Sequence, residues 1–372
     1  MQKKNVVNVL LSATLIVSSL ASVTPVFAQG PESESERTES VVTATNALAG
    51  NALVVLDKKL QVIATIPTGG TGTGGGLGNQ GGIVANDNVL LVVNAGDNTI
   101  SSFKTSDDHL PQLVGTVSSH GVRPISIALR GNIAYVINAG DNTIAGFTVS
   151  RGGSLLFIPG STKVLSGVAP AQIGFAMFEN DDRHEHSARG RSELIVTMKG
   201  SNTIEVIPLV NSLPGASVVN TSNGKTPFGF DVRGDTLRVS EAFGGTASAL
   251  STYRINVDGT LTVLSGSVDA VGQKAACWVA ITSDGKYAYT TNTASNSVSS
   301  YRVRRDGSAM LSETIAATTA AGPIDMAIGG RTLNVLTSQG LVSFAIASNG
   351  VLTELVTNTA TAGANGLVVL GE

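Results

Sequence analysis

A hairpin pattern repeats along almost the whole chain, and no other feature restricts the possible folds as strongly. Each copy has an apolar strand, a polar turn and a second apolar strand, as in residues 91–100 and 134–144. Glycines such as Gly96 and Gly140 can take positive φ in these turns, and the neighbouring Asn and Asp can form Asx turns. The residue that ends the first strand of each hairpin marks seven copies, namely Asn46, Asn94, Asn138, Met198, Glu241, Asn292 and Thr337.

The spacing of these markers identifies the repeat as a propeller blade. Successive markers are 48, 44, 60, 43, 51 and 45 residues apart. An additional strand rich in small residues precedes most hairpins, and a fourth strand follows each one. Four strands at this period are typical of β-propeller blades. We therefore predict an all-β, seven-bladed β-propeller with four-stranded blades; the alternative, an open β-solenoid, would need shorter rungs and capping.

The two ends of the repeat region predict how the ring closes. The first hairpin, from Val41 to Asp57, has no inner strand before it, whereas residues 365–370 form one unpaired apolar segment at the end of the chain. We expect this last segment to become the inner strand of the N-terminal blade. Such pairing would close the ring and remove a free sheet edge.

The N-terminal 40 residues predict export followed by a leader. Lys3 and Lys4, the apolar stretch up to Leu20 and the small residues around Ala28 predict a signal peptide over 1–28. A retained membrane anchor is the alternative, but the apolar stretch is short and contains Ser and Thr. Residues 29–40 are acidic and lack apolar side chains, which predicts a disordered leader, and 41–372 would be the propeller. The expected location is secreted, extracellular or periplasmic, with no membrane span after cleavage.

Composition restricts the partners and the bonds that hold the fold. Charged residues make up 14% of the chain and the formal net charge is −3, so the sequence offers no basic patch and nucleic acid is not an expected partner. The single cysteine, Cys277, cannot form an internal disulfide. We expect a core position for Cys277 and Trp278, with a reactive thiol as the alternative, and a monomeric protein.

Three segments and the hairpins together resemble a known family. The hairpins with Val-Asn-Ala-Gly-Asp-Asn-Thr-Ile resemble the YVTN repeats of bacterial propellers. The Gly-rich segment 68–82, the segment 240–245 and the segment 275–279 resemble secreted members of the seven-bladed lactonase-like family. That family includes 6-phosphogluconolactonase and carboxymuconate-cyclising enzymes. The resemblance covers the chain from Val41 onward and implies the fold; its catalytic residues cannot be transferred position by position.

Propeller ligands usually bind where the connectors into the inner strands and the hairpin turns meet, around the axis. On this chain those loops carry one acid, a histidine, three cations and several amides. Lactone opening needs a base for water and donors for the developing oxyanion. The candidate catalytic residues are Glu241 or His120 as the base and Arg123 as a cation. The candidate substrate-binding residues are Lys199, Lys225, Gln80, Gln172, Asn94, Asn138 and Asn292.

Each candidate also has a structural interpretation. Asn94 and Asn138 could simply form turns, and Lys199 and Lys225 could be solvated charges. Glu241 replaces the Asn found in neighbouring copies, which favours function. The Gly-rich segment 69–82 could cradle a phosphate, but it lacks a P-loop ending and is better explained as a packed connector. His184 and His186, in an insertion over 179–191, could bind a metal but lack a third ligand.

Two functions remain open from the sequence. One is a metal-independent lactonase-like hydrolase or cyclase that acts on an anionic small molecule. The other is a non-catalytic extracellular binding or scaffold propeller of the YVTN type. No cofactor and no resident metal is expected in either case, and a small-molecule ligand is the expected partner.

Overall fold

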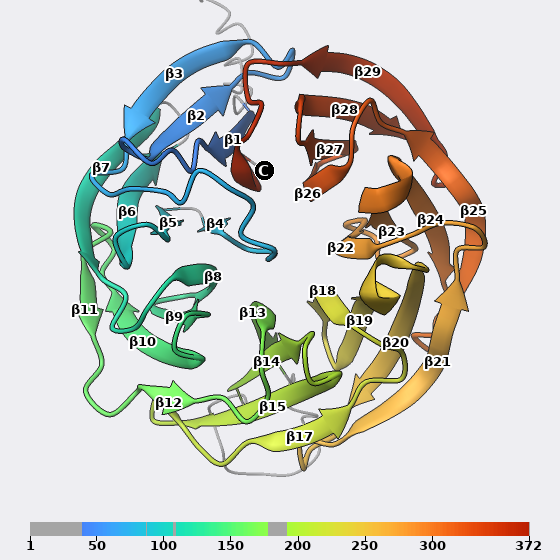
Figure 1. Cartoon of the computed structure of the whole chain (residues 1–372), viewed down its shortest axis with the longest axis horizontal. Coiled ribbons are helices and arrows are strands. Elements are labelled where there is room, and N and C mark those ends of the chain that lie inside the picture. The colour runs from blue at the N-terminus through green and yellow to red at the C-terminus, as the bar shows by residue number, and fades with distance from the viewer. Residues whose placement is uncertain (1–38, 87, 107–108, 178–191, 372) are drawn as a thin grey trace, which may run out of the picture. The chain divides into compact units, whose positions relative to one another are not determined.

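The computed structural model describes residues 39–86, 88–106, 109–177 and 192–371, and these form seven antiparallel sheets arranged around a central axis (Figure 1). The predicted all-β, seven-bladed propeller is confirmed. Each sheet is a blade, whose innermost strand lies nearest the axis. Blade 1 joins the two ends of the chain and contains, from inside to outside, β30 (Asn365–Leu370), β1 (Ser40–Ala44), β2 (Ala52–Leu56) and β3 (Val62–Pro67).

The other blades follow in chain order, each from its innermost strand outward. Blade 2 contains β4 (Ile83–Ala85), β5 (Val89–Asn94), β6 (Thr99–Ser106) and β7 (His109–Ser118). Blade 3 contains β8 (Pro124–Arg130), β9 (Ile133–Asn138), β10 (Thr143–Val149) and the short β11 (Leu155–Phe157) and β12 (Lys163–Val164). Blade 4 contains β13 (Pro170–Met177), β14 (Ser192–Met198), β15 (Thr203–Val210), β16 (Leu213–Pro214) and β17 (Val218–Thr221).

The last three blades have four strands each. Blade 5 contains β18 (Pro227–Arg233), β19 (Thr236–Glu241), β20 (Ala249–Ile255) and β21 (Leu261–Asp269). Blade 6 contains β22 (Ala276–Ile281), β23 (Tyr287–Asn292), β24 (Ser297–Val303) and β25 (Ala309–Thr318). Blade 7 contains β26 (Pro323–Gly329), β27 (Thr332–Thr337), β28 (Gly340–Ile346) and β29 (Leu352–Asn358). Two 3-10 turns, η1 (Phe243–Gly245) and η2 (Thr293–Ser295), lie in hairpin loops.

The ring closes as the sequence predicts, through the last strand of the chain. β30 pairs antiparallel with β1, and Val42 lies opposite Val368. The Thr43 hydroxyl donates to the Gly366 carbonyl at 2.6 Å, across 323 residues of chain. Figure 1 shows the red C-terminal strand beside the blue β1. Blade 1 therefore has its full set of four strands only when both ends of the repeat region meet.

The hairpin turns differ in one respect from the expectation. Gly96 and Gly140 do not adopt positive φ; the left-handed positions are Asn98 and Asn142, with φ of 61° and 59°. Asn tolerates this conformation because its short polar side chain bonds locally. Gly96 is needed for a different reason, because a Cβ there would lie 2.1 Å from the carbonyl oxygen of Gly72.

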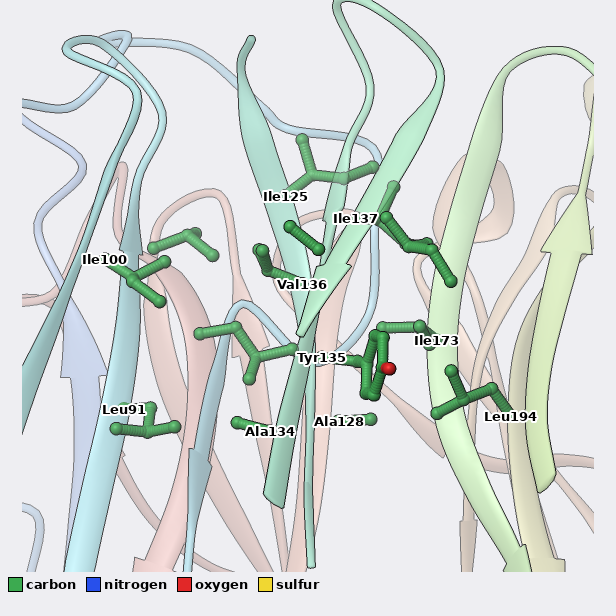
Figure 2. Packing of buried hydrophobic residues seen from close by; sticks show 14 of the residues in the cluster. Leu91, Ile100, Ile125, Ala128, Ala134, Tyr135, Val136, Ile137, Ile173 and Leu194 are labelled. Carbon is green, nitrogen blue, oxygen red and sulfur yellow. The ribbon is translucent and has the colours of Figure 1, made fainter. Parts of the chain in front are cut away.

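The core lies between the faces of neighbouring blades. Figure 2 shows this packing from β5 and β6 through blade 3 to β13 and β14, with Tyr135 at its centre. β9 and β14 are buried on both faces, which explains why apolar residues follow one another at 133–137 and at 194–196. Burial of each Val, Leu or Ile contributes roughly 1.5–3 kcal/mol. The Tyr135 hydroxyl is satisfied by the Ser212 carbonyl at 2.7 Å.

Several predictions concern the ends of the chain and the insertion. The signal peptide, most of the 29–40 leader, and His184 and His186 lie outside the described residues. Within them, β1 starts at Ser40, the last residue assigned to the leader, and Glu39 pairs with Lys58 at 3.7 Å. The structured part of the chain contains no helix of the length and hydropathy that a membrane crossing requires.

Candidate active site at the mouth of the ring

One face of the ring carries all the predicted site residues, and we call it the mouth. It is formed by the connectors that enter the innermost strands and by the hairpins between the second and third strands of each blade. The strand order and direction place these loops together, because each inner strand starts at the face where the preceding blade ends. The opposite face carries the other turns.

The Gly-rich connector between β3 and β4 runs into the centre of this mouth (Figure 1). We call residues 77–82 the plug. The Gln80 amide donates to the Val279 carbonyl at 2.9 Å and accepts from the Val279 N–H at 3.2 Å. The Trp278 indole donates to the Asn79 carbonyl at 2.7 Å, and the Ser126 hydroxyl donates to the Gln80 carbonyl at 2.6 Å. The plug thus joins blades 3 and 6 across the axis.

Glycine is required at several points around the plug. A Cβ on Gly229 would lie 2.1 Å from the Gln80 side-chain oxygen and 2.5 Å from the Cys277 carbonyl. Gly78 and Gly81 have φ of 63° and 78°, a region that other residues rarely adopt. These positions support the interpretation of the Gly-rich segment as a packed connector, and they assign Gln80, a predicted substrate-binding residue, to holding it.

Lys199 is the cation that the structure places closest to the plug. It follows β14, its ammonium group donates to the Gly78 carbonyl, and it lies 4.8 Å from the centroid of the Phe228 ring. Burial lowers the pKa of Lys199 to about 8, and the positive charge of Arg123 acts in the same direction. No carboxylate of the described residues forms an ion pair with Lys199.

Arg123, Lys225 and His120 are more exposed. Arg123 has φ of 57°, and its N–H donates to the Asn98 side chain at 2.7 Å, so its backbone is fixed while its side chain faces solvent. Lys225 is also exposed. The His120 ring stacks on Phe157 of β11 at 3.7 Å between ring centroids. Because β11 is the outermost strand of blade 3, His120 lies at the rim of the ring rather than beside Lys199.

Glu241 is fully buried at the end of β19, and among the described residues it forms no ion pair with a predicted cation. It accepts hydrogen bonds from the Gly224 N–H at 2.7 Å and from the Ser267 hydroxyl at 2.6 Å. The Tyr253 hydroxyl lies at 3.5 Å from the same carboxylate. Glu241 thus connects the incoming loop of blade 5 to its outer strands, and its oxygens are occupied inside the blade.

The predicted asparagines make the corresponding connections in their own blades. Asn94 accepts from Thr68 at 2.8 Å and donates to Ser101 at 2.7 Å. Asn138 donates to the Ser119 carbonyl at 3.2 Å, and Asn292 donates to Ser299 at 2.8 Å. A glycine of the incoming loop covers the marker residue in several blades; the pairs are Gly70 with Asn94, Gly121 with Asn138, Gly167 with Met198 and Gly224 with Glu241. The side chains of the three predicted asparagines therefore bind groups of the ring itself, and Asn94 also accepts from Asn51 of blade 1 at 3.0 Å.

Gln172 resembles Gln80 in the way its amide is used. It donates to the Phe230 carbonyl at 3.0 Å and accepts from the Phe230 N–H at 2.6 Å, so it joins β13 to β18. Cys277 has the predicted core position, and burial raises the pKa of its thiol to about 11. This keeps the thiol protonated at neutral pH.

Asp325 is a buried carboxyl near the axis that the candidate list does not include. It lies on β26, and burial raises its pKa well above the ordinary value, against hydrogen bonds from the backbone of Met326 and Leu367. Its position on an innermost strand was the available sequence signal. Across the described ranges, no three His, Cys, Asp or Glu side chains are grouped as metal ligands.

The structure therefore brings Lys199 together with the plug and with the Phe228 ring. The charges of Arg123 and Cys277 act on Lys199. The side chains of Glu241 and the three asparagines bond to other groups of the ring, and the His120 ring stacks on Phe157. This arrangement offers positive charge in a partly desolvated setting, where electrostatic interactions are stronger than in water. It suits the binding of an anion or of a developing oxyanion.

Comparisons with known proteins agree with this architecture. Residues 195–369 match the family model described as Lactonase, 7-bladed beta-propeller. A proposed 6-phosphogluconolactonase from Bacteroides fragilis has a TM-score of 0.66 and 16% identity, with 91% of this chain and 99% of that chain covered. A periplasmic gluconolactonase from Pseudomonas aeruginosa has a TM-score of 0.66 and 15% identity, with 89% and 99% covered.

A protein from Lactobacillus plantarum gives a TM-score of 0.67 at 16% identity, with 90% of this chain and 99% of that chain covered. No curated protein matches the chain. At such low identity the solved structures support the fold alone, whereas the family match is made on the sequence itself. The resemblance to the seven-bladed lactonase-like family is confirmed over residues 195–369, which match that family's model and lie within a ring completed by the strands from Ser40 to Leu370.

Proposed function

We propose that this propeller binds and hydrolyses a lactone-type, negatively charged small molecule at the mouth. Two observations support the proposal. The lactonase propeller family model matches residues 195–369, and proteins of similar fold include a periplasmic gluconolactonase. Lactones are therefore the first class of compound to test, and the ligand would lie beside the plug, between Lys199 and Arg123.

The main support for the proposal is the partly buried ammonium group of Lys199, which the described residues leave unpaired. Its side chain is partly buried, has no carboxylate partner among the described residues, and lies against the Phe228 ring. A desolvated cation without a counter-ion costs free energy, which a bound anion would offset. The same charge would stabilise the oxyanion that develops when water attacks a lactone carbonyl.

Anion binding without catalysis is the second candidate, and one observation favours it. Glu241, the predicted base, already accepts two close hydrogen bonds inside blade 5. With Glu241 occupied, water would have to be activated by another group, such as the neutral amine of Lys199 above its lowered pKa. A scaffold or binding propeller needs no such group.

A panel of sugar and dicarboxylate lactones, followed by pH-stat with and without a chelator, tests hydrolysis and metal independence together. We expect Lys199→Gln to lower turnover about a hundredfold, the usual effect of losing one oxyanion donor. Lys104→Gln, at an exposed position on β6, is the matched control and should not change turnover. Binding by calorimetry without turnover would establish the second candidate, and neither binding nor turnover would reject both.

We also propose that the chain is exported and acts as a monomer outside the cytoplasm. The charged and apolar pattern of residues 1–28 supports export. N-terminal sequencing of protein recovered from the extracellular or periplasmic fraction should begin at Gln29. Sedimentation equilibrium should give the mass of one chain; an uncleaved, membrane-bound product would contradict the export proposal.

A further inference from the structure

The face opposite the mouth has an open cleft between blades 5 and 6. Its volume is about 390 Å³, within the range of roughly 300–1,000 Å³ that is usual for small-molecule sites. Three turns form it, and strands β19 and β20 supply its floor. The turns are those between β18 and β19, between β22 and β23, and between β24 and β25.

Arginine dominates the lining of this cleft. Five arginines and three aspartates face it, namely Arg233, Arg238, Arg254, Arg304, Arg305, Asp235, Asp284 and Asp306. Two of the aspartates are neutralised: Asp235 pairs with Arg254 at 3.5 Å, and Asp284 pairs with Lys286 at 2.9 Å. Removing Arg254 and these two acids leaves four arginines and one acid, so the cleft has an excess of positive charge.

Within the described residues, none of the four remaining guanidinium groups is paired with a carboxylate. Arg233 donates to the Ser283 carbonyl at 2.5 Å, and Arg304 lies 3.4 Å from the Met310 sulfur. The remaining acid, Asp306, accepts from the Ser308 hydroxyl at 2.6 Å and from the Ser308 N–H at 2.9 Å. The carboxylate that could balance the arginines is thus held within its own turn.

Arg238 is the least expected member of the cluster. It is only 4% exposed, its Nε has no hydrogen-bond partner among the described residues, and its terminal nitrogen donates to the Thr236 carbonyl at 3.5 Å. Asp231 lies opposite it on β18 and attracts it, but no ion pair joins the two side chains. A buried guanidinium with free donors is costly unless an anion accepts from it.

We propose that this cleft is a binding site for a small molecule carrying a tetrahedral, doubly charged oxyanion, either a phosphoryl or a sulfuryl group. The planar guanidinium fork of arginine binds two oxygens of such a group at once, and several arginines can share its charge. Arg238 would hold the oxyanion at the floor, while Arg304 and Arg305 close over it from the turn. The site is separate from the mouth, so it does not depend on the lactonase proposal.

Calorimetry on the full chain at low ionic strength and pH 8 tests the proposal, with inorganic phosphate, sulfate, pyrophosphate and acetate as probes. We expect saturable binding of at least one of the first three, and at least tenfold weaker binding by Arg304→Ala/Arg305→Ala. Both positions are exposed, so this variant should fold. A preference for phosphate and pyrophosphate would assign the site to phosphoryl groups, and a preference for sulfate to sulfuryl groups.

Two controls separate this site from other positive charge. Arg151→Ala removes an exposed arginine from a turn of blade 3 on the same face, and it should leave binding unchanged. In a Lys199→Gln background, Arg304→Ala/Arg305→Ala should cause the same loss of binding, which shows that the binding that is lost does not take place at the mouth. Absence of saturable binding, acetate binding as tightly as the dianions, or an equal loss in Arg151→Ala would overturn the proposal.

Discussion

Gln80 and Val279 form a two-bond bridge across the axis of the ring, although 199 residues separate them in the chain. The side-chain amide of Gln80 takes the place of a neighbouring strand, because it satisfies both the carbonyl and the N–H of Val279. The buried backbone of β22 therefore depends on a side chain supplied by the plug.

Replacing Gln80 by Ala should lower the free energy of unfolding by about 2–4 kcal/mol, because each buried backbone group left without a partner costs about 1–3 kcal/mol. Urea denaturation measures the loss. Gln112→Ala, at an exposed position on β7, is the matched control and should change stability by less than about 0.5 kcal/mol. Equal stability of the two variants would show that the bridge adds nothing.

Removing the last strand should prevent the ring from closing. Truncation after Gly363 deletes β30, exposes one edge of β1 and removes buried side chains such as Leu367. Each of these contributes roughly 1.5–3 kcal/mol, against a net stability of about 5–15 kcal/mol for a typical domain. We expect insoluble or unfolded protein. A soluble product with an unchanged melting temperature would contradict this, and deletion of 29–38 is the control.

Anion binding at the mouth should weaken as the pH rises through about 8. Burial lowers the pKa of Lys199 to about 8, so its positive charge is present below that pH and is lost above it. The neighbouring Cys277 thiol does not titrate in this pH range, because burial raises its pKa to about 11. Affinity for a dicarboxylate lactone should fall about tenfold for each pH unit above 8.

Calorimetric titrations between pH 6.5 and 9.5 would measure this profile. In Lys199→Gln the affinity should be low and independent of pH over the same range. A wild-type affinity that stays constant up to pH 9.5 would remove Lys199 from the binding site, while a parallel decline in the variant would indicate another titrating group.

Glu241→Ala should act on stability before it acts on any reaction. The substitution leaves the buried Gly224 N–H and the Ser267 hydroxyl without their acceptor, at a cost of at least about 2 kcal/mol. Thermal unfolding would show this as a lower melting temperature. If the folded variant also loses all turnover at a temperature where it remains native, Glu241 has the catalytic role that its sequence pattern suggested.

The fold could be predicted because its signals are local. Hairpin turns, the alternation of polar and apolar residues along their strands, and the unpaired segments at the ends can each be recognised from a few consecutive residues. The roles of Glu241 and Gln80 could not be predicted, because their hydrogen-bond partners come from distant loops. One signal did exist for Glu241: it occupies the marker position of Asn94 and Asn138, and the three side chains bind within their blades in related ways. No sequence motif marks Arg238 as a binding residue, and its importance became apparent only from its burial in the structure.

The pairing of β1 with β30 also limits when blade 1 can be completed during synthesis. The first strand of the ring to leave the ribosome has no inner neighbour until the last strand has been made, so blade 1 cannot be completed during synthesis. Contacts between such distant segments are slow to form because the loop they close is long. Blade 1 can therefore be completed only after synthesis has reached β30, and a chain that stops before Asn365 would lack the innermost strand of this blade.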